Sequence, residues 1–216
     1  SSRLVAFLVN LHTTPRTIWL TRHGESQFNV RGIIGGDSPL SPRGEQYARA
    51  LAEFVRARAP KDLKVWTSTL RRSIDTAREF PQAIAWRALD EIDAGVCDGL
   101  TYAEIAQRMP GEYAARSADK FRYRYPRGES YQDVIQRLDP VIIELERQRV
   151  PVLVVAHQAV LRALYAYLMD LPPSDCTRIP IPLHTVIELV PQAYGAEERR
   201  YPLDPSEAGG DLRGAF

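Results

Sequence analysis

Two histidines in this sequence each follow a short run of β-prone residues, so two imidazole rings could meet at one site. His23 comes after residues 17–20, and His157 comes after residues 152–155. In open α/β sheets, ligands bind beyond the carboxyl ends of parallel strands. Two such strands, each followed by histidine, therefore predict a pair of imidazoles at the mouth of one pocket. For a lone histidine, a buried and hydrogen-bonded structural role would be the simpler interpretation.

Positive groups near the two histidines indicate that the ligand is an anion. Arg22 precedes the first histidine, and Arg72 falls in the first turn of the helix expected after residues 64–67. Residues 35–37, with the sequence Gly-Gly-Asp, form a loop whose amide groups could cradle an anion. The helix after the second histidine would present its N-terminus, which carries partial positive charge. This combination is typical of a phosphate site.

The same groups could hydrolyse a phosphate ester through a covalent intermediate. A neutral imidazole can accept a phosphoryl group and pass it to water, which divides one difficult step into two. The leaving oxygen then needs a proton from a nearby acid. Residues 89–95 offer three candidates, Asp90, Glu91 and Asp93. Their type and spacing alone are equally compatible with solvated loop charges.

The elements that must position these residues alternate along the chain, which predicts an α/β fold. Strands are expected at residues 17–20, 64–67, 152–155 and 186–190. The third of these is apolar throughout, as in a central parallel strand that is covered on both faces.

Helices are expected between the strands, and several have recognisable capping residues. Ser41, Thr101 and Ser130 are the expected N-caps, and two further helices carry residues 70–77 and 161–168. Pro140 predicts a kink in the helix that follows Ser130. From Glu197 onward the chain is polar and glycine-rich, which predicts a frayed tail.

Composition excludes several classes of function. The 216 residues include 28 Lys and Arg against 27 Asp and Glu, a net charge of +1, which argues against a nucleic acid or another general polyanion as partner. Two cysteines, Cys97 and Cys176, lack metal-type spacing and favour a reducing, cytoplasmic setting. The longest apolar run, residues 4–9, is too short to span a membrane and is expected to be a docking helix.

Residues 20–25, Leu-Thr-Arg-His-Gly-Glu, resemble the Arg-His-Gly signature of the histidine phosphatase (phosphoglycerate mutase-like) superfamily. Within it, the chain from about Thr14 to about Tyr201 resembles the bisphosphatase half of the bifunctional 6-phosphofructo-2-kinase/fructose-2,6-bisphosphatase family. The blocks that carry this resemblance are residues 35–38, 65–68, 91–97, 123–131, 144–148 and 157–162. The triplet alone is a weak signal, whereas the blocks together and in order are specific.

This resemblance implies a three-layer α/β/α sandwich with a mostly parallel central sheet. It implies hydrolysis of the 2-phosphate of fructose 2,6-bisphosphate to fructose 6-phosphate and phosphate, through a phosphohistidine and with no metal or other cofactor. His23 matches the nucleophile and Glu91 the proton donor. The groups that hold the transferring phosphoryl match Arg22, Asn29, Arg72 and His157, with the backbone of Gly35 beside the sugar.

The resemblance also assigns a second set of residues to the 6-phosphate end of the substrate. The matching positions are Tyr102, Arg116, Lys120, Tyr131, Gln158 and Arg162. A substrate with two phosphates needs a second cationic pocket, and Arg116 and Lys120 at i, i+4 are expected on one face of a helix. Without the resemblance, these two residues would be interpreted as solvated surface charges.

The implied organisation is a linker or kinase remnant at residues 1–14, a phosphatase domain at 15–202 and a flexible tail at 203–216. The sequence has no Gly-x-x-x-x-Gly-Lys-Ser/Thr loop, so the kinase half is expected elsewhere in the parent polypeptide. Departures from many animal relatives at Ile33, Ala156 and residues 98–99 concern regulation and rate more than the reaction. His12 is expected at the surface, and His184 is expected in a structural turn.

Two alternatives remain open. One is a phosphoglycerate mutase or a broad phosphomonoesterase, against which the second cationic set argues. The other is a non-catalytic module that binds sugar phosphate, against which the intact His23, Glu91 and His157 argue.

Overall fold

A six-stranded sheet forms the centre of the computed structural model, which describes residue 8, residues 14–192 and residues 195–203. The strand order is β3-β2-β4-β1-β5-β6. The first four strands in the chain are mutually parallel, and the last two continue the sheet in antiparallel fashion. The strands are β1 (Ile18–Arg22), β2 (Lys64–Thr67), β3 (Ile84–Ala85), β4 (Val152–Ala156), β5 (Thr185–Pro191) and β6 (Ala196–Pro202). The predicted α/β fold with a mostly parallel sheet is confirmed.

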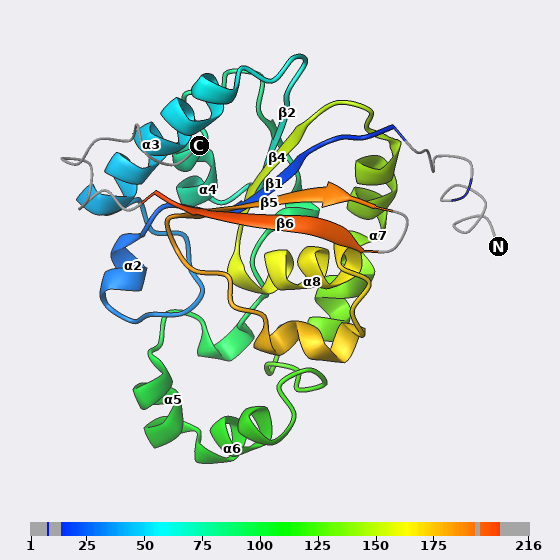
Figure 1. The fold of residues 1–216 in the computed structure, drawn as a ribbon. Helices are drawn as coiled ribbons and strands as arrows, with labels where there is room; N and C mark the ends of the chain where they lie inside the picture. Colours follow the sequence, from blue (N-terminus) through cyan, green and yellow to red (C-terminus); the bar gives the residue numbers. More distant parts are fainter. Residues whose placement is uncertain (1–7, 9–13, 193–194, 204–216) are drawn as a thin grey trace.

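Helices cover both faces of this sheet (Figure 1). On one face α3 (Pro42–Arg58) and α4 (Arg71–Thr76) enclose a core that includes Trp19 and Val155. On the other face α7 (Tyr131–Arg147) and α8 (Gln158–Leu168) pack over Leu20 and Val154. Successive strand residues point to opposite faces, so an apolar run such as β4 supplies both cores. The three-layer α/β/α sandwich is therefore confirmed.

The capping residues act as expected at the starts of three helices. The Ser41 hydroxyl accepts the Gly44 amide at the start of α3. Thr101 and Ser130 form capping boxes at the starts of α5 (Tyr102–Arg108) and α7. The shorter helical elements are α2 (Gln27–Val30), η1 (Arg87–Leu89), η2 (Gly95–Cys97) and η3 (Pro173–Arg178). Helix α7 continues through Pro140, and the kink expected there stays a prediction.

Helices α5 and α6 (Pro110–Ala118) lie away from the sheet, at the bottom of Figure 1. Ile105 of α5 belongs to a separate small core that also includes Tyr125, and α6 packs against α5. The expectation that Arg116 and Lys120 share a helical face is wrong, because α6 ends at Ala118. The carboxylate of Asp119 accepts the backbone N–H groups of residues 121 and 122, so the chain turns there and Lys120 lies in the turn.

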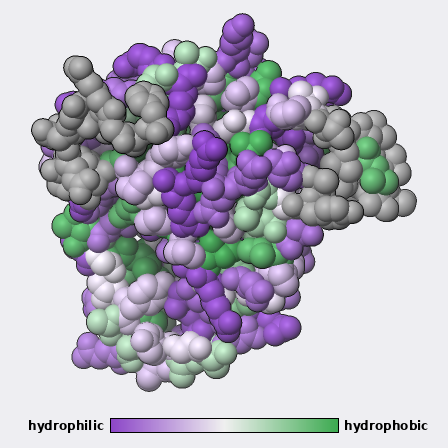
Figure 2. Space-filling view, in the orientation of Figure 1, coloured by the Kyte–Doolittle hydropathy of each residue, from purple (hydrophilic) through white to green (hydrophobic). Residues whose placement is uncertain are grey.

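The prediction of a frayed tail from Glu197 is wrong for residues 197–202, which form β6. This strand pairs along its whole length with β5, from Pro202 opposite Thr185 to Ala196 opposite Pro191. Polar side chains are common on edge strands, where one side of the ribbon faces water. The space-filling view shows mainly hydrophilic side chains across this part of the surface (Figure 2).

Several expectations concern the ends of the chain. The proposed docking helix at residues 4–9, apart from Leu8, and His12 lie outside the described residues, as do residues 204–216 of the expected tail. Leu203, the first residue of the expected tail, donates its N–H to the His184 carbonyl (2.7 Å). Among the described residues, no helix combines the length and the apolar character that a membrane span requires.

Candidate active site

The two histidines meet at the carboxyl ends of adjacent strands, as their positions in the sequence predict. Arg22 and Ala156 are paired at the ends of β1 and β4, so the residues that follow are also neighbours. The His23 N–H donates to the Ala156 carbonyl (3.0 Å), and His157 is the N-cap of α8. The ring centroids of His23 and His157 are 5.0 Å apart.

The hydrogen bonds of His23 define which ring nitrogen can react. Arg72 Nε–H can only donate, so His23 Nε2, 3.1 Å away, must accept with its lone pair. The proton then lies on Nδ1, which donates to the Gly24 carbonyl (2.7 Å). Burial, and after it the charge of Arg72, hold the pKa of His23 well below its ordinary value. His23 is thus a neutral imidazole with a nucleophilic Nε2.

Two arginines supply the positive charge around this nitrogen. Arg72, 5% exposed, also donates from Nη1 to the Gly36 carbonyl (2.6 Å), and its Nη1 lies 3.8 Å from Asp37 Oδ1. Arg22 donates from Nη1 to the Ile181 carbonyl (3.2 Å), and its buried Nε has no partner among the described residues. Burial lowers the pKa of both guanidinium groups, but arginine stays protonated at any physiological pH.

His157 lies behind His23 and does not line the pocket. It is fully buried, its Nε2 is 2.7 Å from the Ser68 hydroxyl, and its Nδ1 has no partner among the described residues. Burial, and after it the proximity of His23, hold the pKa of His157 well below the ordinary value. Ser68 was not among the predicted site residues, although it follows directly on β2 as each histidine follows its own strand.

The expectation of free backbone amides is wrong at two positions, because carboxylates of the protein occupy them. Gly36 N–H donates to Asp98 Oδ1 (2.6 Å), and Ala159 N–H, in the first turn of α8, donates to Glu91 Oε1 (3.1 Å). A helix N-terminus favours a negative charge, and buried amides need acceptors, so acidic side chains satisfy both. Gly35, at φ +71°, passes so close to Asp98 that a Cβ there would lie 1.5 Å from its Oδ1.

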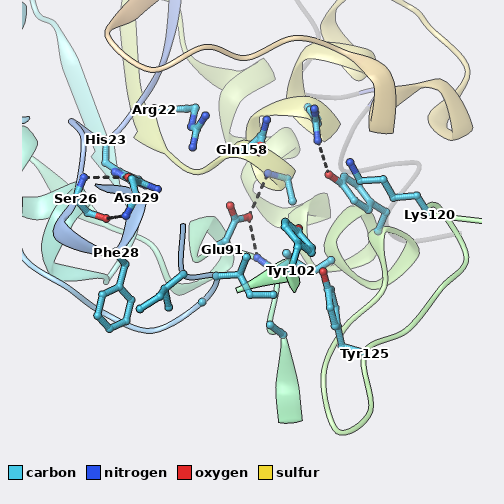
Figure 3. A pocket seen from close by; sticks show the side chains of 18 of the residues that line it. Arg22, His23, Ser26, Phe28, Asn29, Glu91, Tyr102, Lys120, Tyr125 and Gln158 are labelled. Carbon is cyan, nitrogen blue, oxygen red and sulfur yellow. Dashed lines mark hydrogen bonds between the residues drawn. The ribbon is translucent and has the colours of Figure 1, made fainter. Parts of the chain in front are cut away.

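Of the three candidate acids, only Glu91 lines the pocket. Its Oε1 accepts the Ile92 and Ala159 amides (2.9 and 3.1 Å). Asp90 instead accepts the backbone N–H and hydroxyl of Thr69, and Asp93 accepts the Gly95 amide (2.8 Å). In Figure 3, Glu91 lies between the group labelled His23 and Asn29 and the group labelled Lys120 and Tyr125.

A second group of cations lies at the other end of the pocket. Arg116 donates to the hydroxyls of Tyr102 and Tyr125, at 2.8 Å each. Arg162 donates from Nη1 to the Tyr131 hydroxyl (3.1 Å) and from Nε to the Ile179 carbonyl (2.7 Å). Burial, followed by repulsion from Arg162 and Arg116, lowers the pKa of Lys120 to about 8. Three cationic side chains therefore converge here from α6, the following turn and α8.

Except for His157, every predicted site residue lines this one pocket. Asn29 uses its side-chain oxygen to cap α2 by accepting the Ser26 N–H (2.9 Å), which leaves its NH2 group as a donor. Gln158 stands at the first position of α8. The pocket also includes Tyr123 and Tyr125, which lie in one of the blocks of family resemblance but were not predicted as site residues. His184, at φ +56°, is buried outside this pocket and accepts the Glu25 N–H (3.0 Å), in agreement with a structural turn.

A neutral imidazole flanked by two arginines at the ends of parallel strands is typical of phosphatases that use a histidine nucleophile, and comparison with known proteins identifies the family. The family model described as the histidine phosphatase superfamily (branch 1) matches residues 18–203. The chain belongs to the histidine phosphatase superfamily.

Among curated proteins, the chain is 60% identical over 206 residues to a 6-phosphofructo-2-kinase/fructose-2,6-bisphosphatase of Arabidopsis thaliana. It is 55% identical over 197 residues to 6-phosphofructo-2-kinase/fructose-2,6-bisphosphatase 1 of Homo sapiens. These matches cover 93% and 91% of this chain but only 28% and 42% of the two relatives.

Solved structures with the same fold include more distant relatives. The alpha-ribazole phosphatase of Shigella flexneri superposes with a TM-score of 0.77 at 26% identity, covering 86% of this chain and 96% of that one. Bacillus stearothermophilus YhfR superposes with a TM-score of 0.73 at 30% identity, covering 84% and 94%. The phosphoglycerate mutase-like architecture is thus shared well beyond the bifunctional relatives.

Proposed function

We propose that this chain hydrolyses the 2-phosphate of fructose 2,6-bisphosphate, giving fructose 6-phosphate and inorganic phosphate, through a phosphohistidine at His23. The observation that carries the proposal is a single pocket with cations at both ends and a nucleophilic imidazole at only one of them. A substrate with two phosphates complements such a pocket, because one phosphate reacts while the other is held. The names of relatives that are 55–60% identical supply the particular sugar bisphosphate.

In the first step, His23 Nε2 attacks the phosphorus of the 2-phosphate. The N–P bond forms as the bond from phosphorus to the sugar oxygen breaks, and that oxygen takes a proton from Glu91. Arg22 and Arg72, with the NH2 group of Asn29, stabilise the negative charge on the phosphoryl oxygens. Arg72 must release Nε2 for the attack, and its N–H can then turn to a phosphoryl oxygen.

In the second step, water attacks the phosphohistidine. Glu91, now a carboxylate, accepts a proton from the water, the N–P bond breaks, and phosphate leaves with His23 neutral again. The ring of His157 packs beside that of His23, and we propose that its Nδ1, which has no partner among the described residues, contacts the phosphoryl group once this group is bound.

Arg116, Lys120 and Arg162, with the tyrosines that hold them, are proposed to bind the 6-phosphate. Their binding energy orients the sugar so that its 2-phosphate lies over His23.

By analogy with the relatives' names, the parent polypeptide of this chain is proposed to contain a kinase half. The buried free thiols of Cys97 and Cys176 favour a cytoplasmic setting.

Transfer of label from the substrate to the protein tests the proposal. Wild-type chain mixed with fructose 2,6-bisphosphate labelled in the 2-phosphate, then quenched in alkali where phosphoramidates survive, is expected to carry the label. His23→Ala is expected to carry none. An unlabelled wild-type protein, or label retained by the variant, would overturn the phosphohistidine.

Parallel assays distinguish the two alternatives. Rates on 3-phosphoglycerate or p-nitrophenyl phosphate equal to those on the bisphosphate would favour a mutase or a broad phosphomonoesterase. Substrate binding without phosphate release would favour a non-catalytic module.

A further inference from the structure

The guanidinium group of Arg137, in the middle of α7, is bonded through all three of its nitrogens. Nε and Nη2 donate to the two carboxylate oxygens of Glu129 (2.8 and 3.1 Å). Nη1 donates to the Ala88 carbonyl, and Nη2 donates to the carbonyls of Asp90 and Glu91 (2.6 and 3.2 Å). A single side chain therefore holds three carbonyls of the segment that carries the proposed proton donor.

Glu129 completes this connection on the far side of Glu91. Its carboxylate accepts the Asp93 N–H (3.0 Å), while its own N–H donates to the Asp93 carbonyl (2.9 Å). Arg137 and Glu129 form an ion pair in which both side chains are 23% exposed. Together they are hydrogen-bonded to the backbone before and after Glu91. Residues 90–94 have no regular secondary structure of their own, so their geometry depends on these contacts.

The carboxylate of Glu91 has one anchor outside its own loop. Its Oε1 accepts the amide of Ile92, which moves with the loop, and the amide of Ala159, which belongs to the first turn of α8. The position of the carboxyl group in the pocket therefore depends on the Ala159 amide and on the position of its own backbone, which Arg137 holds by direct bonds.

We propose that Arg137 is a positioning residue for proton transfer, which acts through Glu91 without touching the substrate. The inference rests on the proposed function, because it takes Glu91 as the proton donor. Arg137 does not line the pocket, and its direct bonds to the active-site region go to the loop that carries Glu91. When Arg137 is replaced, the rate of phosphohistidine formation is therefore expected to fall more for a leaving group that needs a proton than for one that does not.

Two substrates separate this role from general damage to the fold. The sugar oxygen of fructose 2,6-bisphosphate needs a proton as it leaves, whereas the phenolate of p-nitrophenyl phosphate leaves without one. In single-turnover formation of the phosphohistidine, Arg137→Ala is expected to slow reaction with the sugar bisphosphate by about 10- to 100-fold. Reaction with the aryl phosphate is expected to slow by less than about threefold.

Matched variants complete the experiment. Glu91→Gln is expected to show the same discrimination, and adding Arg137→Ala to it is expected to change the rate by less than about twofold, since the two residues act as one unit. Arg147→Ala removes an exposed arginine of the same helix, paired with Glu144, and is expected to leave both rates unchanged. If the alanine variant fails to fold, Arg137→Lys takes its place. It keeps the positive charge beside Glu129 but lacks the guanidinium group that bonds the three carbonyls, and the same difference between the two substrates is expected.

The outcomes distinguish the inference from the proposed function. If Arg137→Ala slowed phosphohistidine formation equally with both substrates, the positioning role of Arg137 would be overturned. The same would follow if adding Arg137→Ala to Glu91→Gln caused a further large fall in the rate. A wild-type protein that forms no phosphohistidine, or a Glu91→Gln variant without discrimination, would instead overturn the proposed function.

Discussion

The two ends of the pocket are built largely on different parts of the fold, although both carry cationic side chains. The inner end, made of Arg22, His23 and Arg72 with His157 packed beside His23, stands at the carboxyl ends of the sheet strands and the adjoining helices. At the outer end, Tyr102, Arg116 and Lys120 stand on α5, α6 and the turn after them, away from the sheet, whereas Tyr131 and Arg162 come from α7 and α8, which pack on the sheet. His23 is 3% exposed, whereas Tyr102 is 40% exposed.

The partners of the cations differ in the same way. Arg72 is bonded to an imidazole and a backbone carbonyl and lies near Asp37, which together fix its orientation. Arg116 is held by two neutral phenol hydroxyls, which orient a guanidinium without neutralising it. Rigid placement thus characterises the end where bonds would break in the proposed reaction, and undiminished charge characterises Arg116 at the end proposed to bind the second phosphate.

Removing Arg72 gives the largest expected effect. Arg72→Ala takes away both the donor that faces His23 Nε2 and a charge beside the transferring phosphoryl, so kcat is expected to fall about 10³-fold. Steady-state kinetics of Arg72→Ala with fructose 2,6-bisphosphate measures this fall in kcat. Arg71→Ala is the matched control, because this neighbouring side chain is exposed and paired with Asp75. A loss confined to KM would contradict the assignment of the inner end to chemistry.

Removing Arg116 tests the outer end. Loss of a charge-assisted bond to phosphate is expected to raise KM for fructose 2,6-bisphosphate about 10- to 100-fold with a much smaller change in kcat. Arg108→Ala, at an exposed residue of α5 paired with Glu104, is the control. If Arg116→Ala raised KM for fructose 2-phosphate, which lacks the 6-phosphate, as much as KM for the bisphosphate, the assignment of Arg116 to the 6-phosphate would be wrong.

The pKa of Lys120, lowered to about 8 by burial and by two arginines, predicts a pH dependence of the outer end. Lysine is cationic below its pKa, so attraction for the second phosphate is present at pH 7 and lost as pH rises through 8. Between pH 7 and 9, KM for the bisphosphate is expected to rise by up to about tenfold. In Lys120→Arg this rise is expected to disappear, and a wild-type KM independent of pH would contradict the prediction.

The smallest expected effect separates two neighbouring tyrosines. Tyr125→Phe removes a hydroxyl that orients Arg116, and KM is expected to rise about two- to tenfold, as for one hydrogen bond. Tyr123→Phe removes a hydroxyl that donates to Glu112 (2.8 Å) and is expected to leave KM unchanged. Equal effects of the two substitutions would show that the outer end depends on general packing instead of the orientation of Arg116.

Much of the fold and the inner end could be predicted because their signals are local. The apolar run of β4, the caps at Ser41 and Ser130, and the histidines directly after β1 and β4 are readable within a few residues. Adjacent parallel strands then bring those histidines together by geometry. The residues of the outer end could be predicted only from resemblance to a known family. The expectation that Arg116 and Lys120 share one face of a helix was wrong, because α6 ends before Lys120, where Asp119 turns the chain.

By itself, the sequence determined the α/β architecture and predicted an anionic ligand and His23 as the nucleophile, since periodicity and residue type express these directly. Only the tertiary structure decided which acid reaches the pocket, which amides are already bonded and what holds the loop. The bonds from Gly36 to Asp98, from Ala159 to Glu91 and from Arg137 to Glu91 join residues 62, 68 and 46 positions apart. No local pattern encodes such pairs, because each forms only when packing of the sheet and helices brings distant segments within hydrogen-bond distance.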